Sequence, residues 1–425
     1  MNVEIQKNLK HNLVVNLLDG GFFGFALGFA SFVTVIPLFV SELTSSAILI
    51  GLIPAIHSMG WQLPQILTAH RVSQQTRYKP MVMWMTIHER IPFLGLTLVA
   101  FFLPSLTAGL ALGLIFFFLV WQGLGGGFTA TAWQSMIGKI IPSDRRGTFY
   151  GAQSAAANLL ASLGAVAAGF LLEKLDSPLN FGFCFLIASV MLAVSWAFMA
   201  LTREPESAPA NASGDQRQFW SNLGAILKRD GNFRWFLAAR MLSQFAVMAF
   251  AFYTVYAVRH HGMSKVGVGV MTSVFLGAQI VLNPLMGWIG DRWSHRALME
   301  IGVTAAAASG LLAWWAPGPG WFYLVFILAG VANVAIWTIS MAMILNFGSE
   351  ADRPAYIGLA NSLIAPVTIL APFIGGWLAD SLSYPAAFLA SAAGGLAALS
   401  ILHFRVNDPR RAAAPVDYVE PAGVD

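Results

Sequence analysis

Long apolar segments separated by short polar loops fill nearly the whole chain. A helix needs about 20 mostly apolar residues to cross the hydrocarbon core of a bilayer, and twelve segments reach this length. They lie near residues 12–40, 46–69, 80–103, 106–137, 147–173, 181–202, 233–259, 265–290, 297–316, 320–347, 354–380 and 384–404. None shows the alternation of barrel strands, which runs over ~10 residues. The pattern predicts an all-α polytopic membrane protein with twelve transmembrane helices.

Composition narrows the function classes. Of the 425 residues, 57% are hydrophobic and only 10% are charged, whereas soluble domains carry about 25% charged residues. This excludes a soluble enzyme, a disordered chain and a nucleic-acid binder. With one cysteine, Cys184, the chain has no internal disulfide and no thiolate metal cluster. We expect no metal site, no cofactor and no cleaved signal peptide, since the first apolar segment is far longer than a signal-peptide core.

The positions of the basic residues predict the orientation. Of the 24 Lys and Arg residues, nineteen fall on the side of the N-terminus and three on the other side. Because cytoplasmic loops carry the excess of Lys and Arg, we expect both termini in the cytoplasm. An even number of crossings follows, and short loops favour a bacterial inner membrane.

The chain divides into two related halves. We expect a six-helix bundle over 1–202, a cytoplasmic linker over 203–232, a second six-helix bundle over 233–404 and a cytoplasmic tail over 405–425. Residues 216–228 of the linker predict an amphipathic helix, lying either on the inner leaflet or as a cap on the bundle. At an offset of 207 the second half repeats the first, with Arg146 matching Arg353 and Gly151 matching Gly358. Such repeats are typical of secondary transporters, whose substrate site lies between the halves around a central cavity.

A loop motif identifies a family resemblance. Residues 287–296 read GWIGDRWSHR, between the eighth and ninth predicted spans. This resembles the G-x-x-x-D-R-x-x-x-R signature of the major facilitator superfamily. The motif predicts a conformational latch made of Gly287, Asp291, Arg292 and Arg296, in which Asp291 faces the N-terminus of a neighbouring helix. The first-half copy, ILTAHRVSQQ at 66–75, has His70 where Asp is expected, which predicts an asymmetric latch.

A second resemblance concerns the direction of transport. Residues 371–376 read APFIGG in the eleventh span, similar to the G-P-x-x-G-G stretch of the superfamily's antiporters. In the fifth span the corresponding stretch has lost its proline. An Arg that many proton-coupled antiporters carry three residues before a Gln-Gly pair is Leu119 here, before Gln122-Gly123. The resemblance covers the whole chain but does not identify a subfamily.

Four ionisable residues lie inside predicted spans, where each costs at least ~2.5–3.5 kcal/mol at the helix centre. They are Asp19, Glu89, Arg90 and Arg240. The family resemblance places the first and seventh helices at the cavity, so we expect Asp19 to face Arg240 across it. Asp19 is then either the protonation site or one member of a static ion pair. Because the third helix is peripheral in this family, we expect Glu89 and Arg90 to join it to the second or fourth helix.

Polar and aromatic residues at helical spacing predict the cavity wall. Gln122, Gly126, Thr129 and Trp133 share one face of the fourth span, and Asn333, Trp337 and Ser340 share one face of the tenth. Gln244 follows Arg240 by one turn, and Phe22 and Tyr253 lie nearby in sequence. We expect Gln122, Gln244, Asn333, Trp337, Phe22 and Tyr253 to line a substrate cavity. An aromatic cavity with few fixed charges suits a small amphipathic solute.

Together these patterns predict a secondary active transporter and not an enzyme, working as a monomer by alternating access. The chain has no phosphate-binding loop for ATP hydrolysis. Proton-coupled efflux of a small amphipathic solute is the first hypothesis. An importer or uniporter of a sugar or organic anion, with Arg240 as anchor, is the second. A membrane sensor or a membrane-embedded enzyme is a third, which requires a polar catalytic cluster or a soluble domain.

Overall fold

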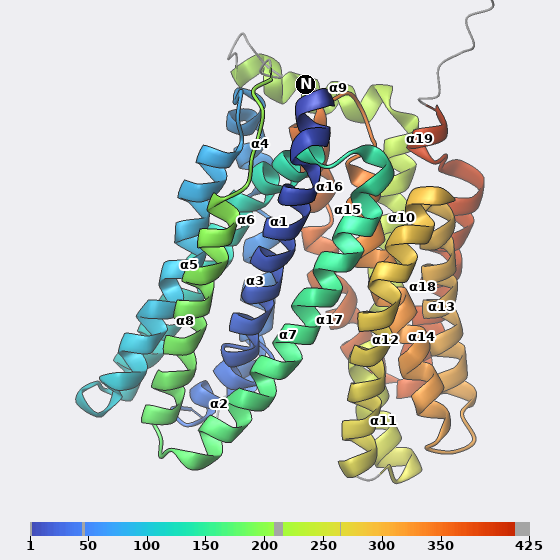
Figure 1. The fold of residues 1–425 in the computed structure, drawn as a ribbon. Coiled ribbons are helices and arrows are strands. Elements are labelled where there is room, and N and C mark those ends of the chain that lie inside the picture. The colour runs from blue at the N-terminus through green and yellow to red at the C-terminus, as the bar shows by residue number, and fades with distance from the viewer. Residues whose placement is uncertain (1, 45–46, 208–215, 264, 413–425) are drawn as a thin grey trace, which may run out of the picture.

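The protein, seen in a computed structural model that describes residues 2–44, 47–207, 216–263 and 265–412, is a bundle of long helices (Figure 1). The first half contains α1 (Asn2–Phe29), α2 (Val35–Ser41), α3 (Ala47–Gln62), α4 (Gln65–Ser73), α5 (Lys79–Phe101), α6 (Ala108–Ile140), α7 (Arg146–Lys174) and α8 (Leu179–Ala200), with 3-10 turns at Leu103–Ser105 and Ser143–Arg145. The linker contains α9 (Gln216–Arg229).

The second half repeats this plan. It contains α10 (Gly231–Val247), α11 (Phe250–His261), α12 (Lys265–Arg292), α13 (His295–Trp315), α14 (Trp321–Val334), the π-helix η3 (Ala335–Ile339), α15 (Ser340–Ile344), α16 (Arg353–Ser362), α17 (Ala365–Ser381) and α18 (Tyr384–Arg405). A final turn, α19 (Pro409–Ala412), follows.

Within the described residues, ten helical stretches are long and apolar enough to cross a membrane. The other two spans are α3 with α4, which are separated at Leu63 and Pro64, and α5, which carries Glu89 and Arg90. The prediction of an all-α membrane protein with twelve transmembrane helices in two bundles is confirmed. Most helix ends lie within three residues of the predicted bounds, but α1 begins at Asn2 and not near residue 12.

Small residues let α1 and α7 pack backbone to backbone. A Cβ atom added to Gly24 would lie 2.6 Å from the Cα of Ala157, and one added to Gly164 would lie 2.5 Å from the carbonyl oxygen of Phe25. Membrane helices associate through such close packing because lipid offers no hydrophobic driving force between them. This pair fixes the helix that carries Asp19 within the first half.

The two halves meet at one end of the bundle, which we call the basic end because α1 begins there and Arg203 and Arg405 lie there. Figure 1 shows the ribbons of the halves converging near the N-terminus and α9 and separating toward the opposite end. α7 packs along α12, and α4 packs along α16. Gly151 contributes to this seam, since a Cβ there would lie 2.8 Å from the carbonyl carbon of Asn283.

The linker helix α9 packs on the bundle. Leu223 and Ile226 are buried in the same core cluster as residues of α4, α6 and α10, with exposed fractions of 5% and 4%. Trp220 is 38% exposed, while the side chain of Phe219 lies outside the described residues. Of the two expectations for this helix, the cap on the bundle agrees with these contacts.

The close α1–α7 contact predicts that a larger side chain at Gly24 destabilises the protein. Gly24→Val should lower the thermal stability of the purified protein, because overpacking of this kind costs about 1–3 kcal/mol. Thermal denaturation followed by size-exclusion chromatography measures the effect. Gly169→Val is the matched control, since it lies on α7 with nothing within 4 Å of an added Cβ. Equal melting temperatures for the two variants would contradict this account of the packing.

Candidate transport site

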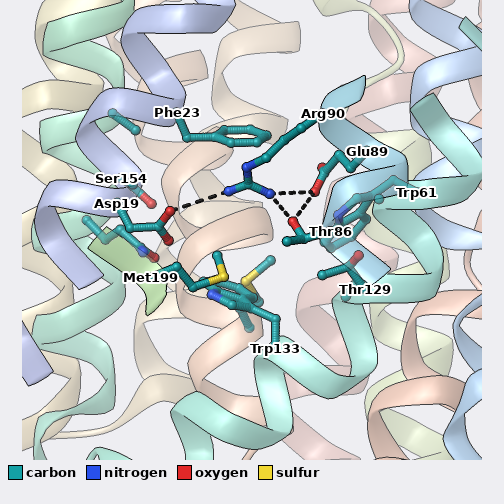
Figure 2. A pocket seen from close by; sticks show the side chains of 16 residues that line it. Asp19, Phe23, Trp61, Thr86, Glu89, Arg90, Thr129, Trp133, Ser154 and Met199 are labelled. Atoms are coloured by element: carbon teal, nitrogen blue, oxygen red, sulfur yellow. Dashed lines mark hydrogen bonds and ion pairs between the residues drawn. The ribbon is translucent and has the colours of Figure 1, made fainter. Parts of the chain in front are cut away.

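A cavity of about 270 Å³ lies in the first half, bordered by α1, α3, α5, α6, α7 and α8. Its wall combines charged residues with large aromatic and sulfur-containing side chains (Figure 2). Among the lining residues only Met341 belongs to the second half. The lining comprises Asp19, Gly20, Phe23, Trp61, Thr86, Glu89, Arg90, Gly126, Thr129, Ala130, Trp133, Gln153, Ser154, Ala157, Met199 and Met341.

One guanidinium connects three helices at this cavity. Nη2 of Arg90 on α5 lies 3.5 Å from Oδ1 of Asp19 on α1 and donates to Oγ of Ser195 on α8 at 3.0 Å. The Ser195 hydroxyl in turn donates to Oδ1 of Asp19 at 2.6 Å. Arg90 Nε donates to the carbonyl of Leu192 at 3.2 Å. Asp19 is therefore held by one cation and one hydroxyl in a site that is only 4% exposed.

Glu89 is a second carboxylate on the same cation. Its Oε2 lies 3.7 Å from Nη1 of Arg90 and accepts a hydrogen bond from Oγ of Thr86 at 3.3 Å. Arg90 also donates to Thr86, so the three side chains form the triangle seen in Figure 2. A Cβ on Gly126 would lie 2.9 Å from Oε1 of Glu89, so this carboxylate lies directly against α6.

The charges of this cluster do not cancel. Asp19 and Glu89 share a single arginine, so the cluster carries a net negative charge when both carboxylates are ionised. Removing charges from water is costly unless each is paired, and here one carboxylate is left over. Binding one proton, or one cationic group, would neutralise the cavity.

The expected pair of Asp19 with Arg240 is wrong. Asp19 faces Arg90, whereas Arg240 on α10 donates through Nη1 to the carbonyl of Ala360 at 3.0 Å and to Oδ1 of Asn361 at 3.4 Å. The expectation for α5 is also wrong in part. Arg90 joins α5 to α1 and α8, and only Glu89 faces α6. Sequence spacing places a charge at a depth in the membrane but does not say toward which neighbour its helix is rotated.

Several predicted lining residues lie elsewhere. Oε1 of Gln122 accepts a hydrogen bond from Nδ1 of His57 at 3.0 Å, and Gln122 is 2% exposed. Phe22 stacks on Phe198 with ring centroids 5.4 Å apart. Tyr253 is 1% exposed, and its hydroxyl lies 2.9 Å from Oγ of Ser309 inside the core of the second half. These three contribute to packing and not to this cavity.

The tenth span departs from regular spacing. The π-helix η3 inserts an extra residue between α14 and α15, so Asn333, Trp337 and Ser340 do not share one face. Trp337 is 37% exposed, whereas Ser340 is fully buried. Gln244 is 5% exposed and also lies outside the cavity wall. On the fourth span, the predicted Gly126, Thr129 and Trp133 do line the cavity.

Asp291 links the halves at the basic end. Its Oδ1 accepts from the backbone N–H of Gly147 at 2.8 Å, and its Oδ2 accepts from that of Thr148 at 2.6 Å. These N–H groups open the first turn of α7, where free donors and the helix dipole favour an anion. Gly287 allows the contact, because an added Cβ would lie 2.7 Å from the carbonyl carbon of Gly147. Nε2 of His295 lies 3.4 Å from Asp291.

The two arginines of the motif do not contact the Asp291 carboxylate. Arg292 lies over the ring of Trp288 at 3.9 Å, and Arg296 pairs with Glu300 at 2.8 Å. Arg410 of the tail instead donates to the carbonyls of Gly290 and Asp291 at 2.6 and 2.8 Å. The expected latch thus consists of Asp291 and Gly287, and the tail takes the place expected for the arginines.

The tail is held by a neighbouring carboxylate. Asp408 accepts from Oγ of Ser294 at 2.8 Å and from the backbone N–H of Arg410 at 3.2 Å. Burial raises the pKa of the Asp408 carboxyl, but the Ser294 hydrogen bond and the Arg410 cation outweigh burial and hold the pKa below its usual value. Asp408 is therefore ionised at neutral pH and fixes Arg410 against the end of α12.

Comparison with known proteins identifies the family. A sequence model described as the Major Facilitator Superfamily matches residues 79–266 and 236–420. The chain belongs to this superfamily. Major facilitator proteins are transporters and not enzymes, which confirms the predicted class and the resemblance found in the sequence.

Two curated relatives match part of this major facilitator chain. A tetracycline resistance protein, class H, of Pasteurella multocida is 25% identical over 145 residues, which is 34% of this chain and 36% of the relative. Multidrug resistance protein 1 of Bacillus subtilis (strain 168) is 29% identical over 150 residues, 35% of this chain and 38% of the relative. The chain thus matches little more than a third of the length of either relative.

Solved structures show the same fold. The E. coli fucose:proton symporter matches with a TM-score of 0.71 at 15% identity, covering 93% of this chain and 98% of that chain. That transporter has also been solved in the outward conformation, with the same TM-score. At this identity the likeness concerns the fold alone.

The cavity contains residues that the sequence did not single out. Phe23 follows the predicted Phe22 by one position, and Arg90 lies over its ring at 5.3 Å. Ser195 and Thr86 complete the charge cluster, yet each is an ordinary polar residue in an apolar helix. The signal that could have found Thr86 is its spacing, one helical turn from Arg90 on the same face.

The contact of Asp291 with α7 predicts that loss of its charge loosens the seam between the halves. Asp291→Asn should open the basic end, because it removes the charge from two charge-assisted hydrogen bonds of about 1.5–3 kcal/mol each. Ala69→Cys, placed in the fully buried α4–α16 contact in a Cys184→Ala background, reports opening by its rate of maleimide labelling. We expect a rise of about tenfold.

Glu300→Gln is the matched control for this measurement. Glu300 pairs with Arg296 and His403 on the second half, away from the seam, so its loss should leave the labelling rate of Ala69→Cys unchanged. A labelling rate that Asp291→Asn does not raise would rule out the latch.

Proposed function

We propose that the protein is a proton-coupled exporter of small amphipathic solutes. The observation that supports this most is the cluster of Asp19, Glu89 and Arg90 at the cavity. Two carboxylates on one arginine leave one negative charge, which a proton can remove. The aromatic walls of Phe23, Trp61 and Trp133 suit the apolar part of a solute.

The proposal includes an orientation. The excess of Lys and Arg at the basic end favours the cytoplasmic side for that end and for both termini. The structure, joined at the basic end and separated at the other, is then the outward-facing state. The likeness to the fucose:proton symporter in its outward conformation supports this assignment. We place the chain in a bacterial inner membrane as a monomer.

Proton binding can drive the conformational change through Arg90. An ionised Asp19 holds Arg90 and Ser195, and so ties α1 to α5 and α8. A proton on Asp19 removes the ion pair to α1 and leaves Arg90 with Glu89 and Thr86 on α5 and with its hydrogen bonds to α8. Because buried ion pairs have discrete arrangements, this change favours one packing of the helices over another. Protons entering from outside would thus return the carrier to the inward-facing state after solute release.

The relatives support export over import. The matching segments belong to a tetracycline resistance protein and a multidrug resistance protein. An antiporter-like stretch at Ala371–Gly376 in α17 agrees with exchange of a solute for protons. A proton-driven importer with the same cluster would move solute in the same direction as protons, which the transport measurement distinguishes.

Transport in proteoliposomes tests the function. With the lumen buffered acidic and the bath alkaline, protein inserted with its basic end outward should concentrate tetracycline or Hoechst 33342 in the lumen against its gradient. Collapse of the pH gradient with an ionophore should reduce the rate to that of protein-free vesicles. Accumulation that is indifferent to the gradient, or that requires the opposite gradient, would contradict proton-coupled export.

Substitution of the carboxylates tests the mechanism. Asp19→Asn should abolish the response of transport to the pH gradient, because the side chain keeps its shape and hydrogen bonds but no longer titrates. Glu300→Gln, remote from the cavity, should retain the response. If Asp19→Asn loses thermal stability while the folded fraction still responds to the gradient, Asp19 is a static ion-pair partner and the coupling role is wrong.

A further inference from the structure

A chain of buried polar side chains crosses the seam between the halves. Arg240 on α10 donates to Oδ1 of Asn361 on α16, and Nδ2 of Asn361 donates to Oε1 of Gln65 on α4 at 2.7 Å. Gln134 on α6 lies within 3.5 Å of both Gln65 and Asn361. We call these four residues the seam bridge. Each is at most 6% exposed.

Arg240 contributes an uncompensated charge to the seam bridge. Within the described part of the chain no carboxylate pairs with it, and its Nε has no hydrogen-bond partner. Its partners are neutral oxygens and the ring of Phe236, whose centroid lies 5.9 Å from the guanidinium. A buried cation without a counter-charge is costly and marks a functional site when it lies in a membrane.

Two other buried cations have carboxylate partners, whereas Arg146 donates to neutral oxygens alone. Arg90 has Asp19 and Glu89, and Lys139 has Glu204 at 3.0 Å with both side chains at most 4% exposed. Arg240 has the same degree of burial without such a partner. Its Nε–H is free to donate to a negative group that the chain itself does not supply.

Separation of the halves at the basic end would expose these donors. Gln65 and Gln134 belong to the first half, and Asn361 and Arg240 belong to the second, so opening breaks the amide contacts in the middle of the bridge. The amide of Asn361 then loses its acceptor while Arg240 stays beside it. A guanidinium and an amide N–H group side by side suit a carboxylate or sulfonate.

We propose that Arg240 and Asn361 form an anion-binding site that opens to the basic end when the halves separate, and that the transported solute is an amphipathic organic anion. The inference rests on the proposed function, whose solute class it names. The carboxylate or sulfonate binds Arg240, and the apolar part lies along the seam. In the state shown, the seam bridge closes this site, and the cavity on the other side has excess negative charge that does not retain an anion.

Calorimetric titration of the purified full-length protein with naphthalene-2-sulfonate tests the site. Asp291→Asn serves as the background, because it releases the latch and populates the state open at the basic end. We expect this variant to bind the sulfonate more tightly than the wild type does, and to bind uncharged naphthalene-2-sulfonamide at least tenfold more weakly. Adding Arg240→Gln should weaken sulfonate binding at least tenfold, which is a change of about 1.4 kcal/mol.

Arg234→Gln in the same background is the matched control. Arg234 lies on α10 but is exposed, so its loss should leave the dissociation constant unchanged. Arg240→Lys keeps the charge and should bind within a few-fold of the background, and Asn361→Ala should weaken binding if Arg240→Gln does not fold. Sulfonate binding that ignores both Arg240→Gln and Asn361→Ala, or no sulfonate binding in the Asp291→Asn background, would overturn the site.

The transport measurement separates this inference from the proposed function. Gradient-driven export of tetracycline or Hoechst 33342 without Arg240-dependent sulfonate binding would overturn the anion site alone. Arg240-dependent binding in a protein that ignores the pH gradient would overturn proton coupling alone.

Discussion

The cost of charge in a hydrocarbon solvent governs this structure. A membrane span tolerates an ionised side chain only where a partner or water compensates it, and the first half solves this with one arginine between two acids. Arg90 holds α5 to α1 and α8 through Asp19, Ser195 and the carbonyl of Leu192. Because the acids outnumber the cation, the cluster carries a net negative charge when both acids are ionised. We propose that this imbalance allows the cluster to take up a proton.

The same constraint shapes the seam. Asp291 is compensated by the first N–H groups of α7, a charge interaction that exists only while the halves touch. Arg240 is compensated only by neutral oxygens, which stabilise a cation less than a carboxylate does. We therefore propose that it binds an anionic ligand. Gly147 and Gly287 make the Asp291 contact possible, since they bring two backbones together where any side chain would hold them apart. In the proposed account, the conformational change and the anion site therefore use the same surface.

The architecture could be predicted from the sequence because it depends on the length of the apolar segments and on which side of the membrane the basic loops lie. Asp291 could be placed at a helix N-terminus because the resemblance of residues 287–296 to the family motif implied this contact. The partner of Asp19 could not be predicted. The position of a residue in the sequence gives its depth along the helix, but whether its side chain points toward α5 or α10 depends on how all twelve helices pack. Regular helical spacing places Trp337 and Ser340 on one face, and this prediction is wrong because a π-helix leaves no clear mark in the sequence. The contact of Arg410 with the end of α12 could not be predicted, because the tail after the last span has no hydrophobic periodicity.

Proton release on solute binding tests the central claim most directly. In weakly buffered detergent solution at neutral pH, a pH indicator records protons displaced when tetracycline or Hoechst 33342 is added to the purified protein. If Asp19 and its neighbours couple solute to protons, the wild type releases protons in proportion to bound solute, and Asp19→Asn binds solute without release. Binding by the wild type with no proton release, or undiminished release from Asp19→Asn, would contradict the account.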